Sequence, residues 1–333
     1  MASASGLTKS AIQSLLTQLD EIEAGPGGGV ITFPGGRLEV SNLRKPFWPK
    51  VKLTKGDLLR HYVRVAPYIL PVLAERPLVM KRFPNGIAGA PFYQHRAPDK
   101  VPAGVRIERV DAGSEIRPHL VGGSLTTLLY TAQLGSISQD PWFSRADSPG
   151  EIDHIAIDLD PPDDLPYRKV LDVALWVRDA LATLRATGFA KTSGAGGLHV
   201  YVPMPAGTAY DSGFLFAQIV ATMVAEQHPA QATVERSIKA RGRRIYVDYM
   251  QNVLGKTLAS AYSARASEFA GVSTPLTWDE VEEGVSPRDF TVANFDRRIA
   301  DAGDVWAGLR KAKPADIRSL KQTPEARRTR SRK

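Results

Sequence analysis

Two aspartates that lie two positions apart could hold a metal ion. The segment His154–Leu159 is mostly apolar and β-branched, which favours a strand, and Pro161 and Pro162 end it because proline cannot donate to a β ladder. Side chains alternate across a strand, so Asp158 and Asp160 point to the same face, with Cα atoms roughly 7 Å apart. Such carboxylates repel each other unless a hard divalent cation lies between them. A bare Asp-x-Asp pair also fits two solvated residues at a strand end, so other features must decide.

Further polar groups along the chain could bind a triphosphate. The segment Lys191–Val202 reads as a strand, a glycine-rich turn and a second strand, with His199 at the exit of the turn. Glycines let backbone N–H groups approach phosphates closely, and the histidine adds a donor. Asp248 is a third carboxylate within the apolar strand Ile245–Tyr249. Each feature has a plain structural alternative, since most glycine-rich turns and most single histidines bind no ligand.

Several cations and aromatic residues could contact a polyanion. Three lysines, at positions 45, 52 and 55, precede a helix start, where backbone N–H groups also favour phosphate. Lys81 and Arg82 are adjacent on a strand and therefore face opposite ways. The pair Phe92-Tyr93 falls in a predicted polar turn, where an exposed ring could stack on a base, and residues 239–244 predict a basic, hairpin-like loop. Solvated charges and buried rings are the alternative reading of each.

Composition narrows the class of protein. The 333 residues are 43% hydrophobic, enough for a folded core, and no stretch is long and apolar enough for a membrane span. The absence of cysteine excludes disulfides and thiolate metal sites, and with no signal-like start we expect a cytoplasmic protein. Residues 310–333 hold ten Lys and Arg against two acids, which equals the net charge of +8 of the whole chain. Such a tail predicts an anionic partner, nucleic acid above all, although a tail that only aids solubility is the alternative.

The periodicity predicts the elements that would position these residues. Apolar stripes predict helices over residues 11–24, 58–73, 124–134, 167–187 and 213–226, and short helices over 277–310. Residues 30–33 and 37–40 predict a hairpin, and residues 77–86 a strand that runs into a turn. We divide the chain into a helical extension with a glycine-rich linker (1–29), one main domain (30–309) and a basic, flexible tail (310–333).

Motifs along the chain carry a resemblance to a known family. Three follow one another in order: Asp-Leu-Asp-Pro at 158–161, Ser-Gly-Ala-Gly-Gly-Leu-His-Val at 193–200, and Val-Asp-Tyr-Met-Gln-Asn at 247–252 with Gly-Lys-Thr at 255–257. Two further signatures are Met-Lys-Arg-Phe-Pro-Asn-Gly at 80–86 and Trp-Asp-Glu at 278–280. The chain resembles the archaeo-eukaryotic primase superfamily, and within it the polymerase domain of bacterial DNA ligase D, as a stand-alone enzyme of the Prim-PolC kind. The resemblance implies an α+β primase-polymerase core, in which an RRM-like sheet bears the acidic triad beside an N-terminal α/β module.

The resemblance assigns roles to individual residues. Asp158, Asp160 and Asp248 match catalytic carboxylates that bind two divalent cations, Mn²⁺ or Mg²⁺. The remaining matched positions are Ser193, His199, Lys256, Arg265 and Lys81 for the nucleotide; Asn42, Lys45 and Lys55 for a DNA 5′-phosphate; Phe92 and Tyr93 for stacking on the template; and Lys239, Arg241, Arg243 and Arg244 for the loop that handles the primer strand.

The function implied is that of a template-dependent nucleotidyltransferase. It would fill short gaps or breaks in DNA from nucleoside triphosphates, with ribonucleotides favoured, beside the bacterial nucleoid. Gapped DNA with a 5′-phosphate, a separately encoded ATP-dependent ligase and Ku are the implied partners. Asp140 stands where the family often has histidine, which leaves the handling of the nucleotide sugar open. A metal-dependent nuclease and a DNA-end-binding module without catalysis remain the alternatives.

Overall fold

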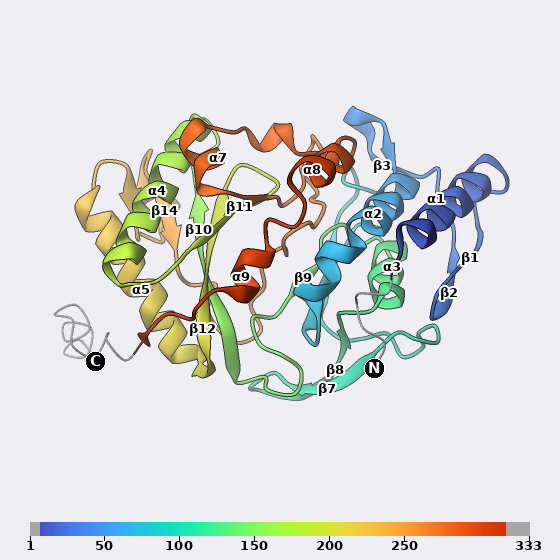
Figure 1. The fold of residues 1–333 in the computed structure, drawn as a ribbon, viewed down its shortest axis with the longest axis horizontal. Coiled ribbons are helices and arrows are strands. Elements are labelled where there is room, and N and C mark those ends of the chain that lie inside the picture. The colour runs from blue at the N-terminus through green and yellow to red at the C-terminus, as the bar shows by residue number, and fades with distance from the viewer. Residues whose placement is uncertain (1–6, 318–333) are drawn as a thin grey trace.

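A six-stranded sheet forms the centre of the C-terminal half of the molecule. The computed structural model describes residues 7–317, and its largest sheet has the strand order β13-β14-β10-β12-β11-β15. The helices α4 and α5 pack against β10 and β12 of this sheet (Figure 1). The bounds are β10 Glu151–Asp160, α4 Tyr167–Thr183, β11 Phe189–Thr192, β12 Leu198–Ala209, α5 Tyr210–Gln227, β13 Ala232–Thr233, β14 Ile245–Asp248 and β15 Pro275–Leu276.

The N-terminal half is a second α/β module. Its larger sheet has the order β6-β5-β8-β7, with β9 paired to β5, and α2 packs against α1 and α3. The bounds are α1 Lys9–Ala24, β1 Gly29–Phe33, β2 Gly36–Val40, β3 Pro46–Trp48, β4 Leu53–Thr54, α2 Lys55–Leu73, β5 Pro77–Arg82, β6 Phe92–Gln94, β7 Ile107–Asp111, β8 Ile116–Val121, α3 Leu125–Gln133 and β9 Asp140–Pro141. The predicted α+β architecture is confirmed.

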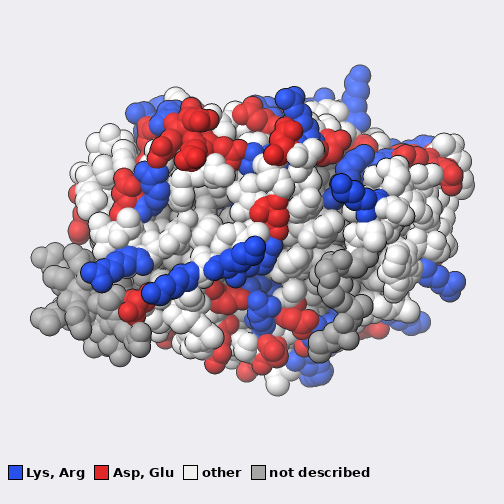
Figure 2. All heavy atoms as spheres, in the orientation of Figure 1, with Lys and Arg blue, Asp and Glu red and all other residues white. Residues whose placement is uncertain are grey.

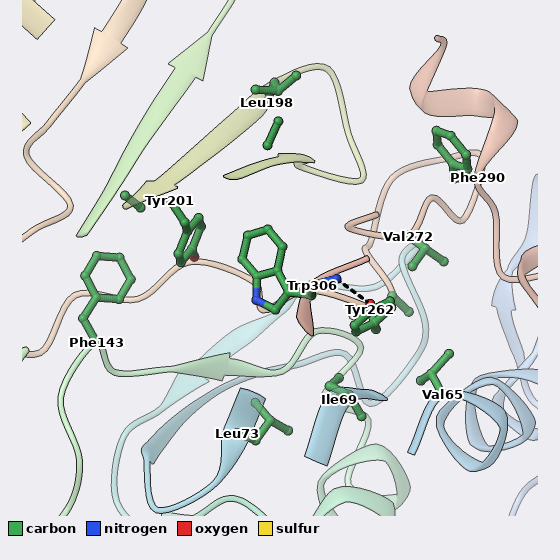
Figure 3. Packing of buried hydrophobic residues seen from close by; sticks show 14 of the residues in the cluster. Val65, Ile69, Leu73, Phe143, Leu198, Tyr201, Tyr262, Val272, Phe290 and Trp306 are labelled. Carbon is green, nitrogen blue, oxygen red and sulfur yellow. Dashed lines mark hydrogen bonds between the residues drawn. The ribbon is translucent and has the colours of Figure 1, made fainter. Parts of the chain in front are cut away.

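The C-terminal segment returns to the junction of the two halves. After the short α6 Ile238–Arg241, the chain forms α7 Trp278–Glu283, α8 Phe295–Ala302 and α9 Ala307–Lys311. Trp306 is buried against the ring of Tyr201 from β12, at a centroid distance of 5.2 Å, and its backbone N–H donates to the Tyr262 hydroxyl over 3.2 Å (Figure 3). Val65, Ile69 and Leu73 of α2 belong to the same core cluster. One hydrophobic core therefore joins the two halves and keeps the large sheet fixed against the N-terminal module.

Most predicted elements form where the patterns indicate, with local differences. Helix α4 ends at Thr183 rather than at residue 187, because Arg185 takes a left-handed conformation with φ of 55°. The first helix packs on the main domain, since Leu15 and Leu19 are fully buried in the common core. The divisions at residues 29 and 309 remain a prediction, and residues 318–333 of the predicted tail lie outside the described part.

Two predicted loops are wrong. Phe92 and Tyr93 do not lie in a polar turn but in β6, which pairs with β5 in an antiparallel manner. The basic segment 239–244 is not a hairpin-like loop throughout, because residues 239–241 belong to the short helix α6, and only residues 242–244 form a turn before β14. In both places, contacts with other segments determine the local structure. The cations of β5 contact the two rings of β6, and Arg241 lies over the Tyr246 ring at 3.8 Å.

Charges of both signs are mixed over most of the face in Figure 2, and basic side chains form a row beside α9. No helix in residues 7–317 is long and apolar enough to cross a membrane.

Candidate active site

Four polar residues form one row across the large sheet. Asp248 on β14 is paired with Asp158 on β10, Asp158 with His199 on β12, and His199 with Lys191 on β11. Cross-strand partners share a face of the sheet, so the four side chains project to the same side. All four are buried, with exposed fractions of at most 7%. The sheet therefore brings together residues that are as far as 90 positions apart in the chain.

Three carboxylates gather at one end of this row. Asp160, two positions beyond Asp158 on β10, joins the pair, and all three offer oxygen atoms that lie within 4.8 Å of one another. Burial, together with the charge of Asp248, raises the pKa of Asp158 to about 7. Burial raises the pKa of Asp160 to about 7 as well, and Asp158 and Asp248 add to the shift. The predicted clustering of these three residues is confirmed as geometry.

Such a cluster fits divalent cations. The mutual repulsion that raises the two pKa values disappears when positive charge lies between the carboxylates. Asp248 is already oriented, because its Oδ1 accepts the Met250 N–H over 2.7 Å and its Oδ2 accepts the Gln251 amide over 2.8 Å. Carboxylate oxygens alone, without sulfur or imidazole ligands, suit hard ions such as Mg²⁺ or Mn²⁺. The three residues could hold such ions without a change of fold.

The glycine-rich turn between β11 and β12 is organised around Ser193. The Ser193 hydroxyl accepts the N–H groups of Ala195 and Gly197, over 3.1 and 3.0 Å. Those two N–H groups are therefore directed to the turn itself. Gly194 has a φ of 75°, and a Cβ there would lie 2.5 Å from Cγ of Arg265. The turn thus requires glycine at this position and keeps Arg265 close, with its guanidinium donating to the Ser193 carbonyl over 2.8 Å.

A cavity of about 670 Å³ opens beside the carboxylates. Charged residues of both signs line it, and its walls include four of the five predicted nucleotide-binding residues, namely Lys81, Ser193, His199 and Arg265. The same walls include Tyr93, Asp140, Asp158, Asp160 and Arg288. Asp140 accepts the Ser138 hydroxyl over 2.7 Å. Burial raises the pKa of Asp140, while Arg265, Lys81 and Lys191 oppose the shift. A carboxylate therefore replaces the expected histidine within the cavity wall.

A smaller pocket of about 200 Å³ lies in the N-terminal module. Asn42, Lys45 and Lys55, predicted to bind a 5′-phosphate, all line it, and Arg82 joins them. No acidic residue lines the pocket within the described chain. Lys55 is the first residue of α2 and its ammonium donates to the Ser41 carbonyl over 2.9 Å. Burial, with the charges of Lys45 and Arg82, lowers the pKa of Lys55 to about 8. Three cations around one small pocket indicate an anion site.

Some predicted residues lie elsewhere. Lys256 is exposed and does not line the large cavity, although its neighbour Thr257 does. Phe92 is 45% exposed and also lies outside that lining, whereas Tyr93 belongs to it. In the basic segment, Arg243 pairs with Asp164 and Arg244 donates to the Arg241 carbonyl over 2.9 Å. Lys239 is exposed. The roles of these residues stay predictions.

Sequence reasoning assigns no role to three residues, of which Arg82 lines the smaller pocket, while Lys191 and Trp48 contact residues that line the large cavity. In the sequence, Arg82 is an ordinary charged residue of a predicted strand. It faces the opposite side of that strand from its neighbour Lys81, and this is the one signal that points to a second site. Lys191 reads as a strand residue, yet it is fully buried beside His199. The indole of Trp48 donates to the Arg265 carbonyl over 3.1 Å, and no pattern in the sequence predicts that contact.

Comparisons with known proteins show the family of the chain. The family model of the LigD primase-polymerase domain matches residues 54–306. The chain belongs to this family. The bifunctional non-homologous end joining protein LigD of Bacillus subtilis is 32% identical over 270 residues, which cover 80% of this chain and 43% of that protein. The multifunctional LigD of Pseudomonas aeruginosa is 30% identical over 274 residues, which cover 81% of this chain and 32% of that protein.

Among solved structures, the LigD polymerase domain of Mycobacterium tuberculosis, determined in complex with DNA, matches with a TM-score of 0.77 and 28% identity. The match covers 84% of this chain and 99% of that domain. The chain spans less than half the length of the two curated LigD relatives described above. The resemblance read from the motifs is therefore confirmed for the primase-polymerase domain.

Proposed function

We propose that this LigD-type domain is a template-dependent nucleotidyltransferase that fills short gaps or breaks in DNA from nucleoside triphosphates. The observation that carries the proposal is the cluster of Asp158, Asp160 and Asp248 within 4.8 Å. Two of its members, Asp158 and Asp160, line a large cavity whose wall also includes Lys81 and Arg265. Carboxylates beside cations suit a reaction in which a metal-bound triphosphate meets a hydroxyl group.

These side chains would have two distinct roles in the reaction. Asp158, Asp160 and Asp248 would hold two divalent cations, which when bound lower the pKa of an attacking 3′-hydroxyl and neutralise charge on the triphosphate. Ser193, His199, Lys81 and Arg265 would orient the triphosphate by hydrogen bonds and charge. Because the large cavity is partly open and polar groups line it, a nucleotide and a primer end can meet over the carboxylates.

The second pocket supports recognition of a 5′-phosphate. A phosphate dianion would offset the repulsion among Lys45, Lys55 and Arg82, and the positive end of the α2 dipole lies at Lys55, the first residue of that helix. A gap has both a primer 3′-hydroxyl and a downstream 5′-phosphate, so one substrate would fill both cavities. Phe92 and Tyr93 on β6 are exposed rings that would stack on template bases, and the basic segment 239–244 would contact the primer strand.

The partners follow from the same assignment. A polymerase that fills a gap leaves a nick, which an ATP-dependent ligase must seal. The relatives are named for non-homologous end joining, and we propose that this chain acts in that repair with a ligase and with Ku. Ribonucleotides are the proposed substrates, with Asp140 as the residue whose carboxylate could accept a hydrogen bond from a sugar hydroxyl.

One assay tests the function. A duplex with a short gap and a 5′-phosphate is incubated with Mn²⁺ and labelled ribo- or deoxyribonucleotides, and the primer is analysed on a denaturing gel. Primer extension that follows the template supports the proposal. Shortening of a strand would favour the nuclease, and retention of DNA without any change would favour a binding module.

A further inference from the structure

The smaller pocket continues into a second hollow, here called the linker groove. The groove has a volume of about 620 Å³, and three residues of the smaller pocket, Ser41, Asn42 and Lys45, line it as well. Its remaining lining consists of Arg44 and of residues 26–28, which connect α1 to β1. No acidic residue of the described chain lines the groove. The two hollows therefore form one continuous surface on which every charged side chain is a cation.

The glycine-rich linker is a fixed wall of this groove. The Gly27 carbonyl accepts the Leu43 N–H over 3.0 Å, and the Gly27 N–H donates to the Ile22 carbonyl over 2.8 Å. Gly27 has a φ of 75°, a left-handed conformation that glycine adopts without steric cost. Because Gly27 and Gly28 have no side chains, a sugar-phosphate chain can approach the backbone of the linker closely.

Arg44 places a guanidinium group beside this wall. Its Nη2 donates to the carbonyls of Ala24 and Gly25 at the end of α1, over 2.9 and 2.6 Å. A guanidinium has five N–H donors, so those on Nε and Nη1 remain, and within residues 7–317 they have no hydrogen-bond partner. A Cβ added at Gly27 would lie 4.0 Å from Nη1 of Arg44, so this nitrogen lies beside the linker. One side of the guanidinium is therefore anchored, and the other presents donors to the groove.

The order of the three hollows gives the direction of a bound strand. Lys81 lines the large cavity, Arg82 lines the smaller pocket, and Lys45 joins that pocket to the linker groove. In a gap, the 5′ end of the downstream strand faces the primer end, and the rest of the strand leads away from it. A strand whose 5′-phosphate occupies the smaller pocket therefore leaves on the side away from the large cavity. The groove lies beside the end of α1, a helix at the opposite end of the molecule from the large sheet (Figure 1).

We propose that the linker groove binds the downstream strand at the phosphate between its first and second nucleotides, and that Arg44 is the cation that contacts this phosphate. Successive phosphates of one duplex strand are separated by about 3.4 Å along the helix axis, so the consecutive residues Arg44 and Lys45 can serve consecutive phosphates. A phosphate contact reads no base, so it adds affinity for any sequence. The proposal rests on the proposed function, because it takes the smaller pocket as the site of the 5′-phosphate.

Uncharged linkages locate the contact without any change to the protein. One gapped duplex has a 5′-phosphate and a methylphosphonate in place of the first internucleotide phosphate of the downstream strand, and a second duplex has the methylphosphonate at the sixth linkage. The affinity of the full chain for each is measured by fluorescence anisotropy at one salt concentration, without nucleotide. We expect the uncharged first linkage to weaken binding roughly 3- to 10-fold, the effect of losing one exposed charged contact, and the sixth linkage to matter less.

Arg44→Gln tests whether this residue makes the contact. The variant should bind the fully charged duplex more weakly by the same factor, and the uncharged first linkage should then cause little further loss, because the residue and the phosphate act as a pair. The glutamine amide can still donate to a carbonyl at the end of α1, and melting curves check that the variant is folded. Arg37→Gln is the matched control, since Arg37 is an exposed arginine of the same module that lines neither hollow. It should keep the full sensitivity to the uncharged linkage.

The outcomes separate this proposal from the function on which it rests. Equal sensitivity to the first and sixth linkages in the wild type would overturn the groove assignment, whatever the variants do. Additive losses from Arg44→Gln and the uncharged first linkage would show that Arg44 is not the contact, and would overturn the proposal as well. If the preference for a 5′-phosphate over a 5′-hydroxyl persists in those cases, the smaller pocket keeps its assigned role. A wild-type chain without that preference would overturn both assignments, and failure to extend a primer would overturn the proposed activity alone.

Discussion

Lys81 and Arg82 are consecutive residues of β5, and their side chains line different cavities. Lys81 belongs to the wall of the large cavity and Arg82 to the wall of the smaller pocket, because side chains alternate across a strand. Each cation also contacts the aromatic residue paired with it on β6: Lys81 lies 5.4 Å from the Tyr93 ring centroid and Arg82 lies 5.1 Å from that of Phe92. One short strand therefore links the two sites at a fixed spacing.

This arrangement predicts that two neighbouring substitutions have different effects. Lys81→Ala should raise KM for the nucleotide, and Arg82→Ala should weaken the preference for a gap with a 5′-phosphate over one with a 5′-hydroxyl, each by roughly 10-fold, the usual effect of removing one charge-assisted hydrogen bond. Arg82 also donates to the Leu134 carbonyl over 2.9 Å, so its variant is checked for folding by thermal melting. Equal effects of both variants on both measurements would contradict the separation of the two sites.

Lys55 predicts a pH dependence of phosphate recognition. Its pKa is lowered to about 8, so the free protein loses this positive charge as the pH rises from 7 to 9. The ratio of affinities for 5′-phosphate and 5′-hydroxyl gaps should therefore fall over that range. Lys55→Met should give a small ratio that does not change with pH. Lys50→Met is the control, because Lys50 is an exposed lysine nearby that does not line the pocket and should leave the ratio unchanged.

The acidic triad can be predicted because its signal is local. Asp158 and Asp160 share a face by strand alternation, and only the pairing of β10 with β14 is needed to add Asp248. The motif order supplies that third residue through the resemblance. The Asn42, Lys45 and Lys55 group likewise comes from matched positions, and the structure brings all three to one pocket.

What could not be predicted depends on contacts between distant segments. Trp48 and Arg265 are separated by more than two hundred residues, and their hydrogen bond has no counterpart in local periodicity. Phe92 and Tyr93 resemble a turn because the residues around them are polar and rich in glycine and proline, but cross-strand contacts with Lys81 and Arg82 stabilise a short strand there. Lys191 escapes prediction since a charged residue in a strand normally faces solvent, and only the structure shows its three buried partners.

The basic residues beyond α9 predict a change in salt dependence. Residues 323–333 contain five Lys and Arg against one acid. Deleting them should weaken binding to every form of DNA alike and flatten the plot of log affinity against log salt concentration, by roughly 0.9 for each duplex phosphate that the segment neutralises. The preference for a 5′-phosphate should persist, because we assign it to Lys45, Lys55 and Arg82. An unchanged slope would show that the segment does not bind DNA.

The ionised carboxylate of Asp158 should lower the stability of the metal-free protein, although metal binding needs it. In the folded state the pKa of Asp158 is raised to about 7, so the folded protein binds the proton of this carboxyl group more tightly than the unfolded chain does. The stability that Asp158 contributes is therefore complete below about pH 4 and is lost as the pH rises through 7. Asp158→Asn should therefore raise the free energy of unfolding of the metal-free protein at pH 8, by an amount on the order of 2 kcal/mol. The same change should abolish nucleotide addition while DNA binding persists.

Metal titration completes this test. In the wild type, Mn²⁺ should raise the melting temperature at pH 8 and do so less at pH 6, because protons compete for the carboxylates. Asp158→Asn should remove most of that response. Asp163→Asn is the matched control, since Asp163 lines the same cavity but lies outside the cluster of three, and it should keep the response to Mn²⁺. Should Asp158→Asn retain a full Mn²⁺ response and normal turnover, Asp158 would not be a metal ligand, and the two-metal assignment would have to be abandoned.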